Sequence, residues 1–272
     1  MSYTSGTANN YQDLLAVLAT YVSTHGWTIL EQSSTKLCLK GSGSVGLDVY
    51  VGIEAFELSG NYYNWRCTGS RGYRNGISVL NQPLCSGPVY LYLWNSSIPY
   101  WIVVSGSRII LIAKISTTYH MLYLGLLTTV STENQNPYPL FVGGGATVGD
   151  TVTYSSTAIS SFWSGRTNSG RLQTTGGDWV DIYSATGCRP LTIQWEGSAE
   201  VITDLDGGYV LDQLFIADTT KPSIYGAVEG VFRVSGYNNS AENTVTISSV
   251  PYLVVPDIFR SSITDYCAMR LN

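Results

Sequence analysis

The stretch Ile98–Leu127 reads IPYWIVVSGSRIILIAKISTTYHMLYLGLL and is the most apolar part of the chain. It contains three runs of β-branched and aromatic residues, Trp101–Ser105, Arg108–Ile115 and Tyr119–Leu127. Ser-Gly-Ser and Ser-Thr-Thr separate these runs, and both are turn-forming groups. Short apolar runs also occur in buried helices, but the enrichment in Ile, Val and Tyr favours a meander of three core strands.

The same stretch is not expected to insert into a membrane. A spanning helix needs about 20 consecutive apolar residues. Arg108, Lys114 and His120 interrupt every window of that length here. We therefore interpret Ile98–Leu127 as the core of a folded protein.

One amphipathic helix is predicted near the start of the chain. Its apolar residues recur at the i, i+3, i+4, i+7 spacing of one helical face: Tyr11, Leu14, Leu15, Leu18, Tyr21 and Val22. Asn10 is a suitable N-cap, and His25 followed by Gly26 is a typical helix end. We expect this helix to cover one face of an antiparallel sheet.

The remaining apolar runs predict short strands on both sides of the meander. In the first half they are Trp27–Gln32, Lys36–Lys40, Leu47–Leu58, Asn61–Thr68 and Val89–Trp94. In the second half they are Trp179–Tyr183, Leu191–Trp195, Tyr209–Ile216, Val228–Val234, Thr244–Ile247 and Tyr252–Val255. The fold class that follows is mainly β.

A break in this pattern suggests a domain boundary. Asn134–Leu140 (NQNPYPL) contains two prolines, and Gly143–Gly145 is a run of three glycines. At 272 residues the chain is long enough for one or two domains. We expect an α+β N-terminal domain over residues 1–144 and a β-sandwich-like domain over residues 145–272.

The segment Gly149–Gly177, called the polar arm below, is rich in Ser, Thr and Gly. Phe162 and Trp163 are its isolated large side chains. Loops of this length without secondary structure are uncommon in compact domains. The segment is therefore either an arm that orders against partner proteins or a region of short strands that the pattern does not reveal.

Composition limits the function classes. Charged residues are 12% of the chain, against about 25% in an average soluble protein, while Tyr occurs 20 times. Such a surface suits contact with protein or sugar. The net charge of -5 offers no basic stripe for a nucleic acid. The polar start MSYTSGTANN is not a signal peptide, which favours synthesis in a cytoplasm.

Two groups of residues are candidates for partner contacts. Tyr62, Tyr63 and Trp65 either form an exposed aromatic platform for glycan or protein, or alternate into the core. Arg71 and Arg74 follow Arg66 closely, in the loop Gly69–Pro88. They either meet carboxylates of a neighbouring subunit or lie in a solvated loop.

No arrangement typical of catalysis is evident. His25 and His120 are the only histidines, and no G-x-S-x-G motif is present. The five cysteines are scattered without a C-x-x-C pair, so neither a zinc site nor a disulfide framework is indicated. Carboxylate pairs of the kind used by glycoside hydrolases do occur: Glu54 with Glu57, Asp178 with Asp181, and Asp204 with Asp206. We expect no catalytic, cofactor-binding or metal site.

Several segments together resemble a family of tailed-bacteriophage virion proteins. The opening YTSGTANNYQDLLAVLATYVSTHGWTILEQ (Tyr3–Gln32) is similar to that family's first helix and strand. Further similar segments are DVYVGIE (Asp48–Glu54), YNW (Tyr63–Trp65), NSSIPYWIVVSGSRIILIAKISTTYHMLYLG (Asn95–Gly125), PYPLFVGG (Pro137–Gly144) and the closing run Tyr225–Asn272. The polar arm has no counterpart in that family.

The resemblance implies a structural subunit of the virion in the tail, neck (collar) or baseplate. Such a subunit is made in the host bacterial cytoplasm. It assembles with copies of itself and either joins neighbouring virion proteins or anchors fibres. The resemblance brings no catalytic residue with it. The alternatives are a carbohydrate-binding or receptor-binding tail fibre component that contacts a host surface glycan, and a glycan hydrolase that uses one of the carboxylate pairs.

Overall fold

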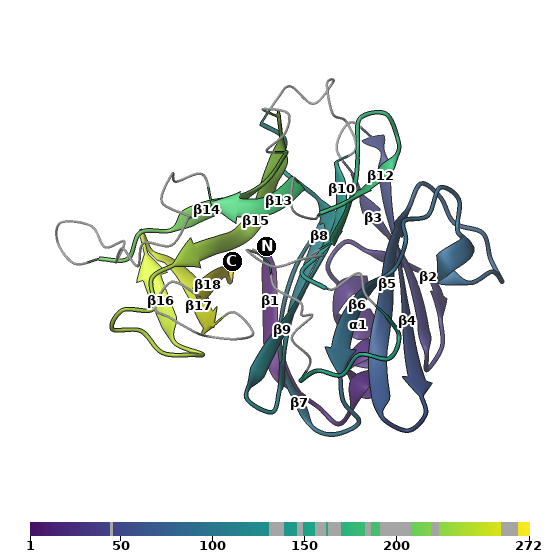
Figure 1. Cartoon of the computed structure of the whole chain (residues 1–272), viewed down its shortest axis with the longest axis horizontal. Helices are drawn as coiled ribbons and strands as arrows, with labels where there is room; N and C mark the ends of the chain where they lie inside the picture. Colours follow the sequence, from purple (N-terminus) through teal and green to yellow (C-terminus); the bar gives the residue numbers. More distant parts are fainter. Residues whose placement is uncertain are drawn as a thin grey trace.

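The structure is a computed structural model of the 272-residue chain. It describes residues 1–43, 46–130, 139–145, 149–155, 162, 170–182, 186–190, 208–218, 223–256 and 266–272. These residues form three antiparallel sheets and one α-helix (Figure 1). The predicted mainly β fold with a single helix is confirmed for the described part of the chain.

The central sheet has the strand order β1-β7-β8-β9-β10-β11-β12. Its strands are β1 (Ser2–Ala8), β7 (Ile98–Ser105), β8 (Arg108–Ile115), β9 (Thr118–Leu126), β10 (Leu140–Gly143), β11 (Gly170–Gln173) and β12 (Trp179–Asp181). The predicted meander is confirmed, because β7, β8 and β9 are antiparallel neighbours. Ser105 pairs with Arg108 across a tight turn.

Two further sheets lie on opposite sides of the central sheet (Figure 1). The N-terminal sheet contains β2 (Thr28–Gln32), β3 (Lys36–Ser42), β4 (Asp48–Leu58), β5 (Tyr62–Ser70) and β6 (Val89–Leu93) in that order. The C-terminal sheet has the order β13 (Thr186–Pro190), β14 (Asp212–Asp218), β15 (Ser223–Val234), β18 (Tyr266–Arg270), β17 (Val250–Pro256) and β16 (Thr244–Ile247). A short 3-10 helix, η2 (Val79–Asn81), follows β5.

The position of the central sheet explains why Ile98–Leu127 is so apolar. Successive side chains of a strand point to opposite faces of its sheet. Ile102 and Leu111 belong to the cluster shared with the N-terminal sheet. Val103 and Ile110 belong to the cluster shared with the C-terminal sheet. Both faces are buried, so apolar residues occupy nearly every position and the alternation typical of a half-exposed strand disappears.

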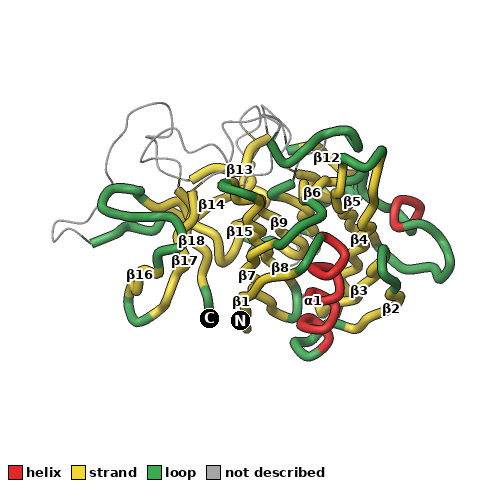
Figure 2. Tube along the Cα trace, turned by 90° about the horizontal axis from the view of Figure 1, so that it is seen from below, coloured by secondary structure: helices red, strands yellow, loops and turns green. Residues whose placement is uncertain are grey.

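Helix α1 (Tyr11–Ser23) confirms the predicted amphipathic helix (Figure 2). The Asn10 side chain accepts 2.9 Å hydrogen bonds from the backbone N–H groups of Gln12 and Asp13, which satisfies donors that no helical carbonyl can reach. The buried face of α1 carries Tyr11, Leu14, Leu15, Leu18, Ala19 and Val22. These side chains pack into the cluster between the central and N-terminal sheets.

Polar contacts join the central sheet to the C-terminal sheet. The backbones of Thr128 and Ala227 exchange hydrogen bonds of 3.0 and 2.7 Å. Arg108 forms an ion pair with Glu229, and the Tyr119 hydroxyl donates to Glu242 over 2.6 Å. The three sheets therefore form one layered body.

The expected boundary at Gly144 falls inside this body. β11 and β12 come after that residue and extend the central sheet beyond β10. In the polar arm, Asp150 forms an ion pair with Arg66, and Phe162 is buried in the cluster shared with the C-terminal sheet. At Asp150 and Phe162 the arm therefore contacts the chain's own sheets. Residues 156–161 and 163–169 lie outside the described residues.

Five strands were not predicted: β1, β10, β11, β13 and β18. Four of the five are five residues or shorter, too short for a periodic pattern to appear. β1 is longer but polar. The predicted strand Leu191–Trp195 lies outside the described residues.

Candidate interaction surfaces

Leu84 is an exposed apolar side chain at an unfavourable backbone conformation. Its φ is 48°, and 68% of its surface is accessible to solvent. The Cys85 N–H donates to the Gln82 carbonyl over 3.1 Å, so Gln82-Pro83-Leu84-Cys85 is a β-turn of type II. Proline suits the second position of this turn, whereas the third, with positive φ, favours glycine or asparagine. Leucine there carries a backbone cost of about 1 kcal/mol.

Hydrogen bonds on both sides hold this turn in place. The Trp179 indole N–H donates to the Leu84 carbonyl over 2.8 Å, and the Arg71 N–H donates to the Pro83 carbonyl over 3.0 Å. The buried Gln82 side chain accepts from the Arg74 N–H over 2.7 Å and donates to the Arg74 carbonyl over 3.1 Å. Leu84 is therefore presented to solvent by a supported loop.

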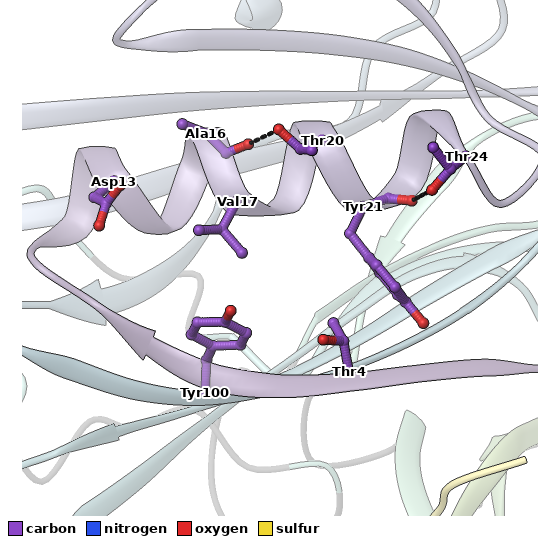
Figure 3. A pocket seen from close by; sticks show the side chains of 8 residues that line it. All are labelled: Thr4, Asp13, Ala16, Val17, Thr20, Tyr21, Thr24 and Tyr100. Atoms are coloured by element: carbon purple, nitrogen blue, oxygen red, sulfur yellow. Dashed lines mark hydrogen bonds between the residues drawn. The ribbon is translucent and has the colours of Figure 1, made fainter.

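A groove lies between α1 and the strands β1 and β7 (Figure 3). Its volume is about 430 Å3. The lining residues are Thr4, Asp13, Ala16, Val17, Thr20, Tyr21, Thr24 and Tyr100. In Figure 3 the Tyr21 side chain extends from the helix toward the sheet, and Tyr100 points from the sheet toward the helix. Two phenol rings and a short aliphatic surface thus share one open space.

The groove residues that belong to α1 lie on the side of the helix that faces away from the core. The hydroxyl groups of Thr20 and Thr24 donate hydrogen bonds to the backbone carbonyls of Ala16 and Tyr21 over 3.0 and 2.9 Å (Figure 3). Burial raises the pKa of Tyr21. Asp13 accepts hydrogen bonds from the backbone and side chain of Asn9, at 2.7 and 2.8 Å. The carboxylate of Asp13 is therefore already occupied.

Gly6 leaves room for the Tyr100 side chain where it lies over β1. A Cβ atom added to Gly6 would lie 2.6 Å from the Tyr100 hydroxyl oxygen. Gly6 pairs with Tyr100 in the sheet, and the hydroxyl end of the tyrosine lies over the glycine. The small residue lets a tyrosine from the second strand form the floor of the groove.

β1 is an edge strand with an open outer side. All seven of its residues pair in register with β7. Among the described residues, no backbone hydrogen bond joins β1 to any segment other than β7. Ser5, Gly6 and Thr7 are exposed. No sequence pattern indicates this surface, since its residues are polar and lie outside any predicted element.

Of the two alternatives for Tyr62, Tyr63 and Trp65, burial in the core is correct for Trp65. This residue is fully buried, and its indole N–H donates to the Tyr11 carbonyl over 2.9 Å. Tyr63 points to the same side and contacts the Tyr11 ring at a centroid distance of 5.4 Å. Tyr62 is its neighbour on the strand and therefore faces the opposite side. The three side chains do not form one surface.

The predicted arginine contacts separate into two environments. Arg66 forms ion pairs with Glu54 and Asp150 at 3.0 and 2.8 Å. Burial alone would lower its pKa, but hydrogen bonds with these carboxylates raise it above the ordinary value. Arg71 and Arg74 are both exposed and lie in the loop that carries Leu84. Arg71 and Arg74 lie near the exposed leucine, whereas Arg66 is occupied within the chain.

Phe162 lies in the core, where 1% of its surface is accessible. It packs in the cluster between the central and C-terminal sheets, so its ring is not on the surface. Trp163, predicted with it as an anchor, lies outside the described residues.

His120 is buried in the central sheet. Burial lowers its pKa to about 3, so the imidazole is neutral near pH 7. Its ring lies edge-on to Tyr92 with centroids 6.4 Å apart. The environment is that of a core histidine.

The predicted carboxylate pairs are divided among ion pairs. Glu54 contacts Arg66, and Asp181 contacts Arg171. Asp204 and Asp206 lie outside the described residues. Within the described ranges, no cluster of three or more His, Cys, Asp or Glu side chains suits a metal ion. Nor does any helix of the described part reach the length and apolar character of a membrane span.

Comparison with known proteins adds no further identification. No protein-family model matches the chain, and a search of curated proteins returns no significant match.

Proposed function

We propose that the chain is a structural subunit of a tailed-bacteriophage virion, in the tail, neck or baseplate. It assembles with copies of itself and with neighbouring virion proteins. The segments that resemble virion proteins support this proposal at the level of sequence. At the level of structure, its main support is Leu84.

Leu84 supports an assembly role because its conformation costs free energy in the isolated chain. An asparagine or glycine would complete the same turn at lower cost. A leucine gains from this position only where its side chain is buried, and full burial stabilises a leucine by roughly 1.5–3 kcal/mol. Its exposed side chain therefore fits a pocket on a neighbouring subunit.

The remainder of the surface agrees with this role. Large apolar side chains are exposed at separate places: Tyr3, Leu47, Leu58, Val130, Val210, Ile224 and Tyr237. With 12% charged residues in the chain, few ionic groups must be desolvated when neighbours pack together. Copies arranged in a closed ring would multiply modest contacts into a stable assembly.

The glycan-binding alternative loses one of the three residues, Tyr62, Tyr63 and Trp65, on which it depended. A sugar platform needs coplanar, accessible rings, and Trp65 is fully buried. We therefore retain assembly as the proposed function.

Immunogold electron microscopy of purified particles tests the proposal, with an antibody raised against this chain. Label at the head–tail junction indicates a neck or collar subunit, and label at the distal end indicates a baseplate or fibre-attachment subunit. An antibody whose epitope centres on the exposed Leu84 would be blocked by the proposed contact, so a polyclonal antibody is needed. Absence of label on both intact and denatured particles would contradict the proposal.

A further inference from the structure

We propose that β1 is a self-association surface, at which a second copy of the chain adds its own β1 as an antiparallel strand. The two strands are related by a two-fold axis through the Ser5 pair. This inference rests on the proposed function and deepens it, because it names the surface through which copies of the subunit meet.

The first argument is that β1 lacks the features that protect sheet edges. Natural edge strands avoid pairing with other chains by being short or by carrying charge, proline or a bulge. β1 reads SYTSGTA and contains neither a charged residue nor proline. Its pairing with β7 is regular over all seven residues, without a bulge. Its outer side is a ready template for another strand.

The other edges of the described sheets differ from β1. β2 has a register shift between Ile29 and Glu31 and carries the charge of Glu31. β12 has three residues and ends at Asp181, β16 has four residues, and β13 ends at Pro190. The side chains of β6 are all buried. The contrast makes β1 the edge that is suited to a partner.

The second argument is that β1 is complementary to itself. With Ser5 opposite Ser5 of the second copy, Tyr3 lies opposite Thr7, Thr4 opposite Gly6, and Ser2 opposite Ala8. An aromatic residue opposite a β-branched residue is a favourable cross-strand pair, and two hydroxyl residues can exchange hydrogen bonds. No like charges meet at any of the seven positions.

The third argument is the groove under α1. Thr4 and Gly6 lie on the face of β1 that carries Tyr100 on β7, so alternate residues of an added strand would project toward the groove. A two-fold axis perpendicular to the sheet places both α1 helices on the same face of the extended sheet. The grooves of the two copies then form one continuous groove. Specific interfaces bury roughly 1,200–2,000 Å2 in total. The uncharged α1 surface at Ala16, Val17 and Tyr21 adds to the area of the paired strands.

The test uses the full chain with opposite charges at the symmetric position. Ser5 is exposed, so Ser5→Lys and Ser5→Glu leave the fold of one copy unchanged, which circular dichroism and urea unfolding verify. In either homodimer, two like charges lie opposite each other at the axis. We expect the dimer dissociation constant to rise about tenfold or more for each variant, measured by sedimentation velocity. An equimolar mixture should regain wild-type affinity, because Lys then faces Glu.

The matched control is Thr246→Lys on β16, which also replaces an exposed hydroxyl residue by lysine on an edge strand. It should self-associate like the wild type. Self-association that is unaffected by Ser5→Lys and Ser5→Glu would overturn the β1 surface and leave the proposed assembly role intact. If the equimolar mixture does not regain the wild-type dissociation constant, the register with Ser5 opposite Ser5 is wrong. A wild-type chain that stays monomeric up to high concentration would overturn both the surface and oligomerisation through copies of this chain.

Discussion

The indole N–H of Trp65 donates a 2.9 Å hydrogen bond to the carbonyl oxygen of Tyr11. This contact joins β5 of the N-terminal sheet to the first residue of α1, and both side chains are buried. The helix is thereby fixed against one sheet at the end where its N-cap, Asn10, also fixes the entering chain. The groove beside β1 depends on this placement of α1.

Trp65→Phe should destabilise the fold by about 2 kcal/mol. The change removes one buried hydrogen bond and leaves a space where the larger ring system packed. Urea unfolding followed by circular dichroism measures the effect. Tyr62→Phe, on the other face of the same strand, is the control and should change the free energy of unfolding by less than about 0.5 kcal/mol. Equal effects of the two variants would contradict the assignment of Trp65 to the core.

Leu84→Asn should leave the isolated chain as stable as the wild type or raise its free energy of unfolding by up to about 1 kcal/mol. Asparagine tolerates the positive φ that leucine adopts at cost. The same variant should enter particles less efficiently, since it lacks the exposed apolar side chain. Urea unfolding and immunoblots of purified particles give the two readouts. A variant that incorporates normally would show that Leu84 is not a partner contact.

Gly125→Ala should destabilise the fold by about 3 kcal/mol or more. The φ of Gly125 is 145°, and an added Cβ would lie 2.2 Å from the Ser107 carbonyl oxygen, which is backbone. Gly60→Ala is the matched control: its φ is 69°, but no atom lies within 4 Å of the new Cβ. The control should cost only the backbone strain, about 1 kcal/mol. The difference between their urea midpoints isolates the steric contribution.

Acidification from pH 7.5 to 5.5 should lower the free energy of unfolding by roughly 1 kcal/mol through His120. Its folded-state pKa of about 3 lies below the ordinary value of 6.5, so the unfolded chain binds the proton first. The contribution is complete above pH 6.5 and decreases as the pH falls toward 3. His120→Gln removes this titration. The urea midpoint of this variant should therefore change less between pH 7.5 and 5.5 than that of the wild type. If both proteins change equally, the loss of stability does not come from His120.

The link between the central and C-terminal sheets should weaken in stronger acid. Hydrogen bonds from Lys114 and Tyr119 lower the pKa of Glu242, so its contribution is present above the ordinary value of 4.5 and is lost as the pH falls below it. Glu242→Gln should cost about 1 kcal/mol at pH 7 and little at pH 3. Urea unfolding at the two pH values checks this. An equal cost of Glu242→Gln at pH 7 and at pH 3 would contradict this role of the Glu242 carboxylate.

The elements with strong periodicity could be predicted from the sequence, and those without it could not. α1 shows six apolar residues on one face and a matching N-cap. β7, β8 and β9 are uniformly apolar because both faces of their sheet are buried. In β1, only Ala8 is buried, so its polar residues give no strand signal. Its place in the sheet is decided by pairing with β7, about a hundred residues away.

The interaction surfaces were partly visible in the sequence. Pro83 marks a turn, but the exposure of Leu84 depends on the φ angle and on the distant Trp179. In the strand around Trp65, aromatic residues occupy adjacent and alternate positions, so spacing alone could not show which face was buried. The groove requires α1, β1 and β7 together, and no local pattern contains all three.

Quantitative mass spectrometry of gradient-purified particles tests the central claim most directly. Peptides of this chain are counted against isotope-labelled standards and compared with those of the major capsid and tail proteins in the same sample. A structural subunit predicts a fixed whole-number copy count per particle that is the same in independent preparations and survives a high-salt wash. Absence of the chain, or an amount that varies between preparations and is lost in the wash, would contradict the account.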